Sequence, residues 1–372
     1  MPRILHASDL HLSESEKDYS LGVFAELIEV ANREHVDYLI FCGDLFDTFV
    51  DAEKLRGEFR KILGTPTFEF LYLPGNHEEL RRGSRHLMRL DWGAARVLHT
   101  KPFDLLTLDR GGMPIEFLSI PHQDQYAGYG NWPIPPKRAA FRIALAHGVV
   151  AGLSYRGPDM EGGGTAMDPD LFARFQVDYA ALGHIHGRRS QSIGPVLFAY
   201  PGSTRVWRSS EDGERGCLLL DVKGGQIVEP RFLPLISAGQ FRHYDLALDL
   251  EGEIPSLDHL AKEWGRQDFI ELEWTGLVED ERAVAQLERT LQEKFSQVVR
   301  RLDIKREGVS ALPGIASQPV VRQFLEAWKL RMPPLKEAVS ALQSEVDLER
   351  VVWLRARELA LNALKTHLER AG

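Results

Sequence analysis

The sequence predicts an α/β protein with two mixed β-sheets sandwiched together and flanked by helices, followed by a small α/β capping domain and a helical C-terminal tail. Strand and helix signals alternate from Met1 to about Leu235, as they do in layered α/β folds. Near Ala238 a shorter series begins, in the order strand, helix, strand, helix, strand. Beyond residue 319 the apolar residues recur only at helical spacing.

Five short, predominantly apolar runs predict buried parallel strands. They are Ile4–Ala7, Tyr38–Cys42, Phe68–Leu73, Ile143–Ala146 and Tyr179–Leu182. Between the first two runs, an amphipathic helix is indicated by apolar residues at helical spacing, namely Leu21, Phe24, Leu27, Ile28 and Ala31. The same spacing predicts a second helix through Leu55, Phe59 and Ile62, which ends before Pro66.

The rest of the first domain is expected to contain shorter strands. They are Val97–Thr100, Phe103–Leu108, Ile115–Ile120, Val196–Tyr200, Cys217–Val222 and Ile227–Leu233. Two glycine-rich loops, Gly128–Pro136 and Gly152–Ala166, follow strand ends. Each is either a rim of a functional site or an ordinary surface loop.

After this domain we expect strands at Tyr244–Leu250, Phe269–Trp274 and Val298–Ile304, and helices at Ser256–Trp264 and Asp280–Phe295. Pro and Gly residues predict a linker over Gly308–Pro319. Apolar stripes on Val320–Trp328 and Leu348–Leu368 predict helices that pack on the chain's own second domain or on a partner. The predicted boundaries are therefore 1–237 for the first domain, 238–307 for the small domain, 308–319 for the linker and 320–372 for the tail.

The composition is that of a globular protein, with 44% hydrophobic and 27% charged residues. No apolar run approaches the ~18–20 residues that span a membrane, and Met1–Ile4 leads into a strand rather than a signal peptide. Cys42 and Cys217 lie in apolar runs, which favours two buried thiols over a disulfide. We therefore expect a cytoplasmic protein without membrane contact.

Polar side chains follow each of the five predicted parallel strands. The segments are Asp9-Leu10-His11, Gly43-Asp44, Gly75-Asn76-His77-Glu78, His147-Gly148 and Gly183-His184-Ile185-His186. Because the carboxyl ends of parallel strands meet at one edge of a sheet, these groups are expected to converge. Imidazole, carboxylate and amide ligands without thiolate suit manganese, iron, zinc or magnesium, and argue against a structural zinc site. A pair of such ions is suited to hydrolysing phosphate esters.

Together the five segments resemble the calcineurin-like metallophosphoesterases. The runs Arg3–Leu12 and Gly43–Thr48 are similar in particular to the SbcD-type DNA repair nucleases. The resemblance implies the metallophosphoesterase fold and two divalent metal ions, with manganese favoured over magnesium, iron or zinc. By the same resemblance, Asp9, His11 and His186 would hold the first ion and Asp44 would bridge both. Asn76, His147 and His184 would complete the second.

His77 would not bind metal in this assignment. It would point at the phosphate and stabilise or protonate the leaving oxygen, as a histidine near neutral pH is suited to do. Three further residues are candidates for a supporting or substrate-contacting role: Glu78 as a partner of His77, Asp47, and His122 at a strand end. His6 is expected in the core. Arg205, Arg208 and the pair Arg188-Arg189 are either phosphate contacts or solvated surface charge.

The resemblance implies a metal-dependent phosphodiesterase that acts on DNA as an exonuclease or endonuclease in repair, with an SbcC-type ATPase as partner. The net charge of −9 disfavours strong DNA binding by this chain alone, which fits a partner that contributes to the DNA grip. The alternatives are a phosphoesterase for a small nucleotide or a phosphoprotein, and a non-catalytic scaffold. The complete ligand set argues against a scaffold. Many relatives dimerise, so a homodimer also stays open.

Overall fold

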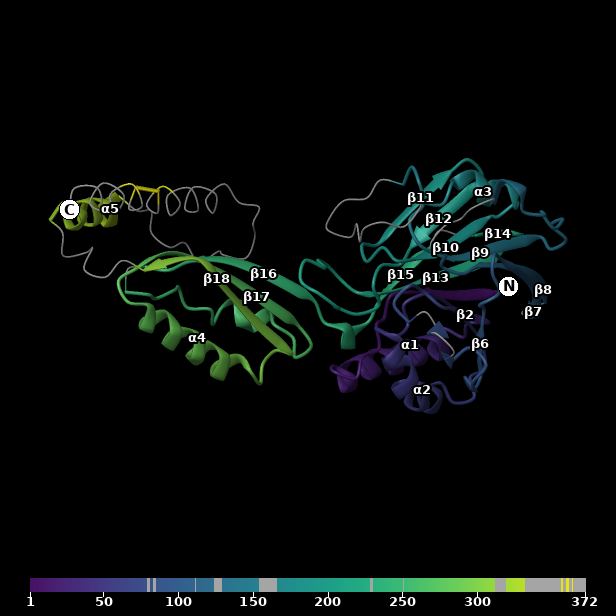
Figure 1. Ribbon diagram of the computed structural model, residues 1–372, viewed down its shortest axis with the longest axis horizontal. Helices are drawn as coiled ribbons and strands as arrows, with labels where there is room; N and C mark the ends of the chain where they lie inside the picture. Colours follow the sequence, from purple (N-terminus) through teal and green to yellow (C-terminus); the bar gives the residue numbers. More distant parts are fainter. Residues whose placement is uncertain are drawn as a thin grey trace. The chain divides into compact units, whose positions relative to one another are not determined.

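The computed structural model describes residues 1–78, 81–82, 85–110, 112–123, 129–153, 166–227, 230–249, 251–311 and 319–331, with the single positions 356, 359, 360 and 363. The chain divides into two compact units, Met1–Gln240 and Phe241–Gly372 (Figure 1). Among the described residues, no helix combines the length and the apolar character needed to cross a membrane.

The first unit contains two mixed sheets, which confirms the predicted architecture. In the first sheet the order is β14-β13-β1-β2-β3-β6, and β15 also pairs with β13. The neighbours β1, β2, β3 and β6 are parallel, whereas β13 runs antiparallel to β1. Its strands are β1 (Arg3–Ala7), β2 (Tyr38–Cys42), β3 (Glu69–Leu73), β6 (Ala95–Val97), β13 (Gly216–Lys223), β14 (Gln226–Ile227) and β15 (Arg231–Pro234).

The second sheet has the order β11-β12-β10-β9-β8-β7. Its central strands β12, β10, β9 and β8 are parallel, and the edge strands β11 and β7 are antiparallel to their neighbours. Its strands are β7 (Asp104–Arg110), β8 (Met113–Ile120), β9 (Phe141–His147), β10 (Tyr179–Gly183), β11 (Arg189–Ile193) and β12 (Val196–Tyr200). The sequence pattern did not indicate β11, because its polar residues Ser190, Gln191 and Ser192 are exposed.

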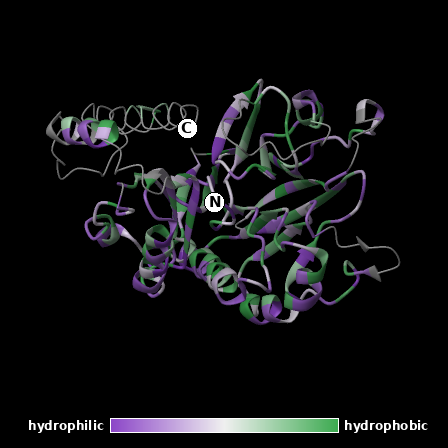
Figure 2. Cartoon of the chain, turned by 60° about the vertical axis from the view of Figure 1, so that its left-hand side comes forward, coloured by the Kyte–Doolittle hydropathy of each residue, from purple (hydrophilic) through white to green (hydrophobic). Residues whose placement is uncertain are grey.

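Three apolar clusters hold the sheets and helices of the first unit together. One lies between the first sheet and helices α1 (Lys17–Arg33) and α2 (Phe49–Leu63), and it includes Phe24 and Phe59. A second joins the two sheets, and a third lies on the other face of the second sheet with α3 (Pro169–Arg174). Burial of both sheet faces explains why the parallel strands appear as continuous apolar runs. Figure 2 shows hydrophobic and hydrophilic residues interleaved along the helices, as expected for elements with one buried face.

Short elements complete the first unit. They are β4 (Arg81–Arg82), β5 (Arg85–His86), η1 (Tyr129–Asn131) and η2 (Ile236–Ala238), where η denotes a 3₁₀ turn. The predicted strand Ile227–Leu233 corresponds to two strands, β14 and β15, which both pair antiparallel with β13, and residues 228–229 lie outside the described residues. Most of the predicted loop Gly152–Ala166 lies outside the described residues, as do residues 124–128.

The second unit is built on three parallel strands, β16 (Phe241–Ala247), β17 (Phe269–Val278) and β18 (Arg301–Ala311). Helix α4 (Glu281–Phe295) contributes Phe295 to an apolar core that includes Leu272 and Trp274. The predicted helix Ser256–Trp264 is wrong, because this segment forms only the short η3 (Leu260–Glu263). Helix α5 spans Pro319–Arg331.

The predicted linker is also wrong over residues 308–311, which continue β18. Residues 312–318 and 332–350 lie outside the described residues. So does the predicted stripe Leu348–Leu368, apart from isolated positions. The domain boundaries proposed from the sequence therefore stay predictions.

Candidate metal centre

The polar segments that follow the parallel strands converge at the carboxyl ends of both sheets. Asp9 and His11 follow β1, Asp44 follows β2, and Asn76 follows β3. The second sheet contributes His147, the last residue of β9, and His184 and His186 after β10. Stacking of the two sheets therefore brings residues from five strands to one site.

Several of these residues have a backbone conformation that non-glycine residues rarely adopt. The φ angles are 53° at Asp9, 50° at His11, 51° at Asp44 and 96° at His184. A positive φ is unfavourable for a side chain with Cβ, and such residues cluster where function requires a particular orientation. Here the sharp turns point the side chains back across the strand ends.

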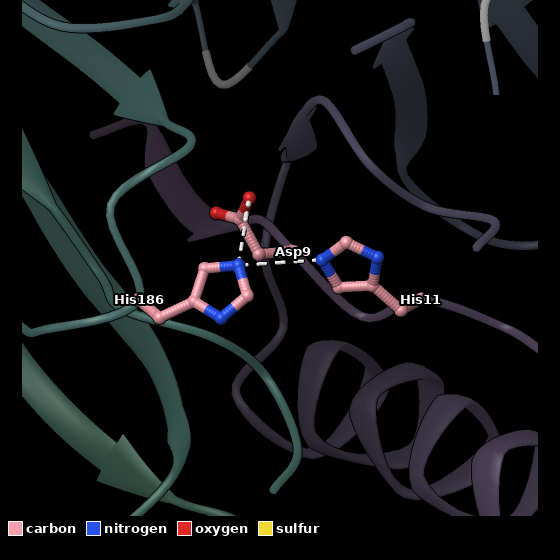
Figure 3. A group of neighbouring side chains, drawn as sticks. All are labelled: Asp9, His11 and His186. Carbon is pink, nitrogen blue, oxygen red and sulfur yellow. Dashed lines mark hydrogen bonds and ion pairs between the residues drawn. The ribbon is translucent and has the colours of Figure 1, made fainter. Parts of the chain in front are cut away.

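A first cluster consists of Asp9, His11 and His186, all buried (Figure 3). Nε2 of His186 lies 3.3 Å from Nε2 of His11 and 3.8 Å from Oδ1 of Asp9. Nδ1 of His186 is hydrogen-bonded to the buried Glu211 carboxylate, so the Nε2 lone pair is directed at the cluster. Nitrogen and oxygen acceptors that face one another in this way are suited to a cation.

A second cluster consists of Asp44, His147 and His184, with Asn76 among them. Oδ1 of Asn76 lies 2.9 Å from Nε2 of His147 and 3.2 Å from Nδ1 of His184. Oδ2 of Asp44 lies 3.1 Å from Nε2 of His147. The backbone N–H of His184 donates to both carboxylate oxygens of Asp9, at 3.0 Å each, which links the two clusters.

Asp44 lies at the middle of the centre. It belongs to the second cluster and also to a group with His11 and His77, whose ligand atoms lie within 4.8 Å of one another. Its Oδ1 accepts a hydrogen bond from the backbone N–H of His77 at 3.0 Å. The ring of His77 stands edge-on to His11, with 4.8 Å between the ring centroids, and Nδ1 of His77 lies 3.1 Å from the Asp47 carbonyl oxygen. His77 is thus adjacent to both clusters.

Burial is the largest single influence on the pKa values of the site residues. It raises the pKa of Asp9 and lowers the pKa of His184 to about 3. Burial also lowers the pKa of His147, but the charge and hydrogen bond of Asp44 outweigh it and raise this pKa to about 10. The buried carboxylates of Asp9 and Asp44 and the imidazoles of the two clusters form a mixed oxygen and nitrogen donor set without thiolate. This set fits divalent ions of the manganese, iron, zinc or magnesium type.

Three glycines of the motifs leave the space that the ligands occupy. A Cβ on Gly43 would lie 1.9 Å from Nδ1 of His147, and one on Gly75 would lie 2.1 Å from Oδ1 of Asp44. A Cβ on Gly183 would lie 1.8 Å from the Cys42 carbonyl oxygen. Real Cβ atoms do not approach this closely, so glycine is required where each strand end passes its neighbour.

The structure changes the interpretation of Glu78. Its side chain is fully buried and accepts hydrogen bonds from the Tyr72 hydroxyl at 2.8 Å and from the backbone N–H of Gly75 at 2.9 Å. Burial raises its pKa to about 8, and the nearby charge of Asp44 contributes. Glu78 therefore supports the loop after β3, and its expected role as a partner of His77 stays a prediction.

The other two supporting candidates lie beside the centre. Oδ1 of Asp47 is 3.3 Å from Nδ1 of His11 and 3.9 Å from Nδ1 of His77, so Asp47 lies between the two rings. The ring of His122 lies edge-on to His147, with 6.3 Å between the centroids. Nδ1 of His122 is buried without a hydrogen-bond partner among the described residues.

The predicted arginine roles are corrected at Arg205. Its guanidinium is fully buried and donates to the carbonyl oxygens of Leu10 and His11 at 2.7 Å each, so it is neither a phosphate contact nor a surface charge. His6 lies in the core as expected, hydrogen-bonded to the Tyr179 hydroxyl at 2.9 Å.

Sequence reasoning missed Trp207 and Glu211. The Trp207 ring is stacked on His11, with 4.0 Å between the centroids and 8° between the planes. Glu211 binds His186. Both belong to a segment after β12 that has no strand or metal-ligand pattern, so nothing in the local sequence pointed to it.

Comparison with known proteins supports a family assignment. The family described as calcineurin-like phosphoesterase matches residues 2–188. The chain is 31% identical over 229 residues to the DNA double-strand break repair protein Mre11 of Saccharolobus solfataricus, covering 57% of this chain and 56% of that protein. It is 27% identical over 290 residues to the SbcD component of the nuclease SbcCD of Rhodobacter capsulatus, covering 63% of this chain and 69% of that protein.

A third relative is the uncharacterized metallophosphoesterase YhaO of Bacillus subtilis, 25% identical over 249 residues, with 60% of this chain and 58% of that protein covered. The chain thus spans just over half the length of the Mre11 and YhaO proteins. The family match covers half of the chain and includes every segment that forms the two clusters. With the fold and the site in agreement, this chain belongs to the calcineurin-like phosphoesterase family.

Proposed function

We propose that this protein is a two-metal-dependent phosphodiesterase that cleaves DNA. The observation that carries the proposal is the position of Asp44, whose carboxylate belongs to a group with His11 and to a group with His147 and His184. A carboxylate shared between two ligand sets is what a pair of adjacent divalent ions requires.

In this proposal Asp9, His11 and His186 hold one ion, Asn76, His147 and His184 hold the other, and Asp44 is shared. Manganese is the favoured metal because of the resemblance to the SbcD-type nucleases, and the mixed oxygen and nitrogen donor set also suits magnesium, iron and zinc. When bound, the ions would neutralise the phosphate charge and make water a better nucleophile at neutral pH.

The chain's own residues supply orientation and a proton. The side chain of His77 is 23% exposed, whereas the Asp44 side chain is only 2% exposed. A substrate phosphate can therefore reach His77, and Asp47 keeps its ring in place through the hydrogen bond at Nδ1. We assign His77 to donate a proton or a hydrogen bond to the leaving oxygen. His122, beside His147, is a further substrate-contact candidate.

DNA is the proposed substrate because two of the relatives are named as a DNA repair protein and as part of a nuclease. The net charge of −9 supports a partner that contributes to DNA binding. We propose that this partner is an SbcC-type ATPase, by analogy with the second relative. An assay on a linear duplex with labelled ends, with Mn²⁺ and with and without the ATPase, tests both parts. Hydrolysis of small nucleotides or phosphoproteins with no cleavage of DNA would overturn the proposal in favour of the alternative substrate class.

A further inference from the structure

We infer that the segment Ser203–Glu211 sets the affinity of one metal position, the one formed by Asp9, His11 and His186, with Glu211 as the positioning residue of His186. This inference rests on the two-metal function proposed above. It adds that the two positions are supported by different parts of the chain, so that the affinity of one can change without the other.

Glu211 is 4% exposed, and both of its carboxylate oxygens are engaged. Oε1 binds Nδ1 of His186, while Oε2 accepts from the backbone N–H of Trp207 at 2.8 Å and from the Ser203 hydroxyl at 3.3 Å. A carboxylate held at this ring nitrogen fixes the tautomer that leaves Nε2 free to bind metal, and it raises the basicity of the ring. Glu211 therefore acts on the metal through His186.

The same segment holds the other two ligands of this cluster. Arg205 donates to the backbone carbonyl oxygens of Leu10 and His11, and the stacked Trp207 ring limits rotation of the His11 imidazole. The backbone N–H of Thr204 is shared between the carbonyl oxygens of Ser8, at 3.1 Å, and Asp9, at 3.2 Å. Every ligand of the first cluster is thus in contact with residues 203–211.

The second cluster is supported from elsewhere. Nδ1 of His147 lies 2.9 Å from the Cys42 carbonyl oxygen, and the Asn76 amide lies between His147 and His184. The clusters are linked by the hydrogen bonds from the His184 backbone to Asp9 and by the shared Asp44, and a change at Glu211 leaves both in place. A substitution at Glu211 is therefore expected to act on one metal position.

The test is a calorimetric titration of the metal-free full-length chain with Mn²⁺. The variants are Glu211→Ala, which removes the partner of His186, and Glu211→Gln, which keeps the size and an acceptor oxygen. Glu214→Gln is the matched control, because Glu214 is exposed three residues away. We expect two binding steps in the unaltered chain and in the control. In Glu211→Ala, one step should weaken by roughly 10–100-fold, with a smaller loss in Glu211→Gln and the other step unchanged.

Thermal unfolding of the metal-free proteins separates positioning from folding. Similar midpoints in all four proteins, combined with loss of one step only, support the inference. Equal weakening of both steps, no weakening, or an unfolded Glu211→Gln protein would overturn it. If the unaltered chain itself binds fewer than two ions, the proposed two-metal function fails first, and the variants are not needed to see it.

Discussion

Exposure distinguishes His77 from the metal-ligand candidates His11 and His147. The side chains of His11 and His147 are completely buried, whereas that of His77 is 23% exposed. A buried imidazole at a cluster of carboxylates suits a metal ligand, and a partly exposed one suits a group that meets substrate. This difference among neighbouring histidines underlies the first two predictions.

His77→Ala is expected to keep both metal ions and to lower phosphodiester turnover by about 10²–10⁴-fold. Both ions are expected to remain bound because the hydrogen bond from the backbone N–H of residue 77 to the Asp44 carboxylate is unchanged. Metal analysis together with hydrolysis of a chromogenic phosphodiester measures both effects. His99→Ala, at an exposed position, is the control. Loss of an ion from His77→Ala would show that His77 is a ligand.

Asp44→Asn is expected to weaken binding of both ions together, because it removes a negative charge that both ligand sets share. A Mn²⁺ titration of the metal-free protein measures the two affinities. Asp109→Asn, at an exposed position in β7, should leave both affinities unchanged. If Asp44→Asn emptied one position and left the other intact, Asp44 would be a terminal ligand and not a bridge.

At the scale of elements, the site depends on turns that follow the strands more than on the strands themselves. Asp9, His11 and Asp44 have positive φ, and the motif glycines pass within contact distance of ligand side chains. A helix glycine such as Gly57 has no such neighbour. Adding one methyl group should therefore have opposite effects at the two kinds of position.

Gly75→Ala is expected to displace the Asp44 carboxylate, weaken metal binding and lower the free energy of unfolding by about 1–3 kcal/mol, the usual cost of overpacking. Gly57→Ala, inside α2, should instead stabilise the protein by about 0.5–1 kcal/mol, because alanine favours the helix. Denaturant unfolding and a Mn²⁺ titration compare the two variants. Unchanged metal affinity in Gly75→Ala would contradict the packing argument.

At the scale of the whole molecule, the chain combines a unit that contains the candidate metal centre with a second unit. The family match ends at residue 188, so the second unit lies outside it. In helix α5, Val321 is fully buried and its neighbour Val320 is half-exposed. Both packing sites expected from the sequence, the chain's own second domain and a partner, stay predictions. The residues beyond α5 are the segment that we propose to dock a partner.

Deletion of the residues after Arg331, which keeps α5, is expected to leave Mn²⁺-dependent hydrolysis of a small phosphodiester almost intact. Association with the proposed ATPase and processing of long duplex DNA should be lost, because the residues that we propose to dock on the ATPase are removed. Size-exclusion chromatography with the ATPase and a duplex assay measure these effects. Aggregation of the truncated chain would place those residues in the protein's own core instead.

The sequence by itself determined the parallel strands and the polar residues that gather at their carboxyl ends. Strands such as Tyr38–Cys42 are buried on both faces and therefore stand out as apolar runs, and Asp44 or His147 comes at the end of such a run. Prediction from the sequence failed where the local pattern is ambiguous. Ser256 suggested the start of a full helix, but the segment forms only the short η3. Prediction also failed at the exposed strand β11, whose polar residues carry no alternation.

Only the tertiary structure decided which residues support the ligands. Glu211 reaches His186, and Arg205 reaches Leu10 and His11, across a sequence separation that no local period encodes. Glu78 is adjacent to His77 in the chain, yet its carboxylate is turned into the interior toward Tyr72 and Gly75. Ligands at strand ends follow from the order of strands, whereas the contacts that orient them arise only when separate segments pack together.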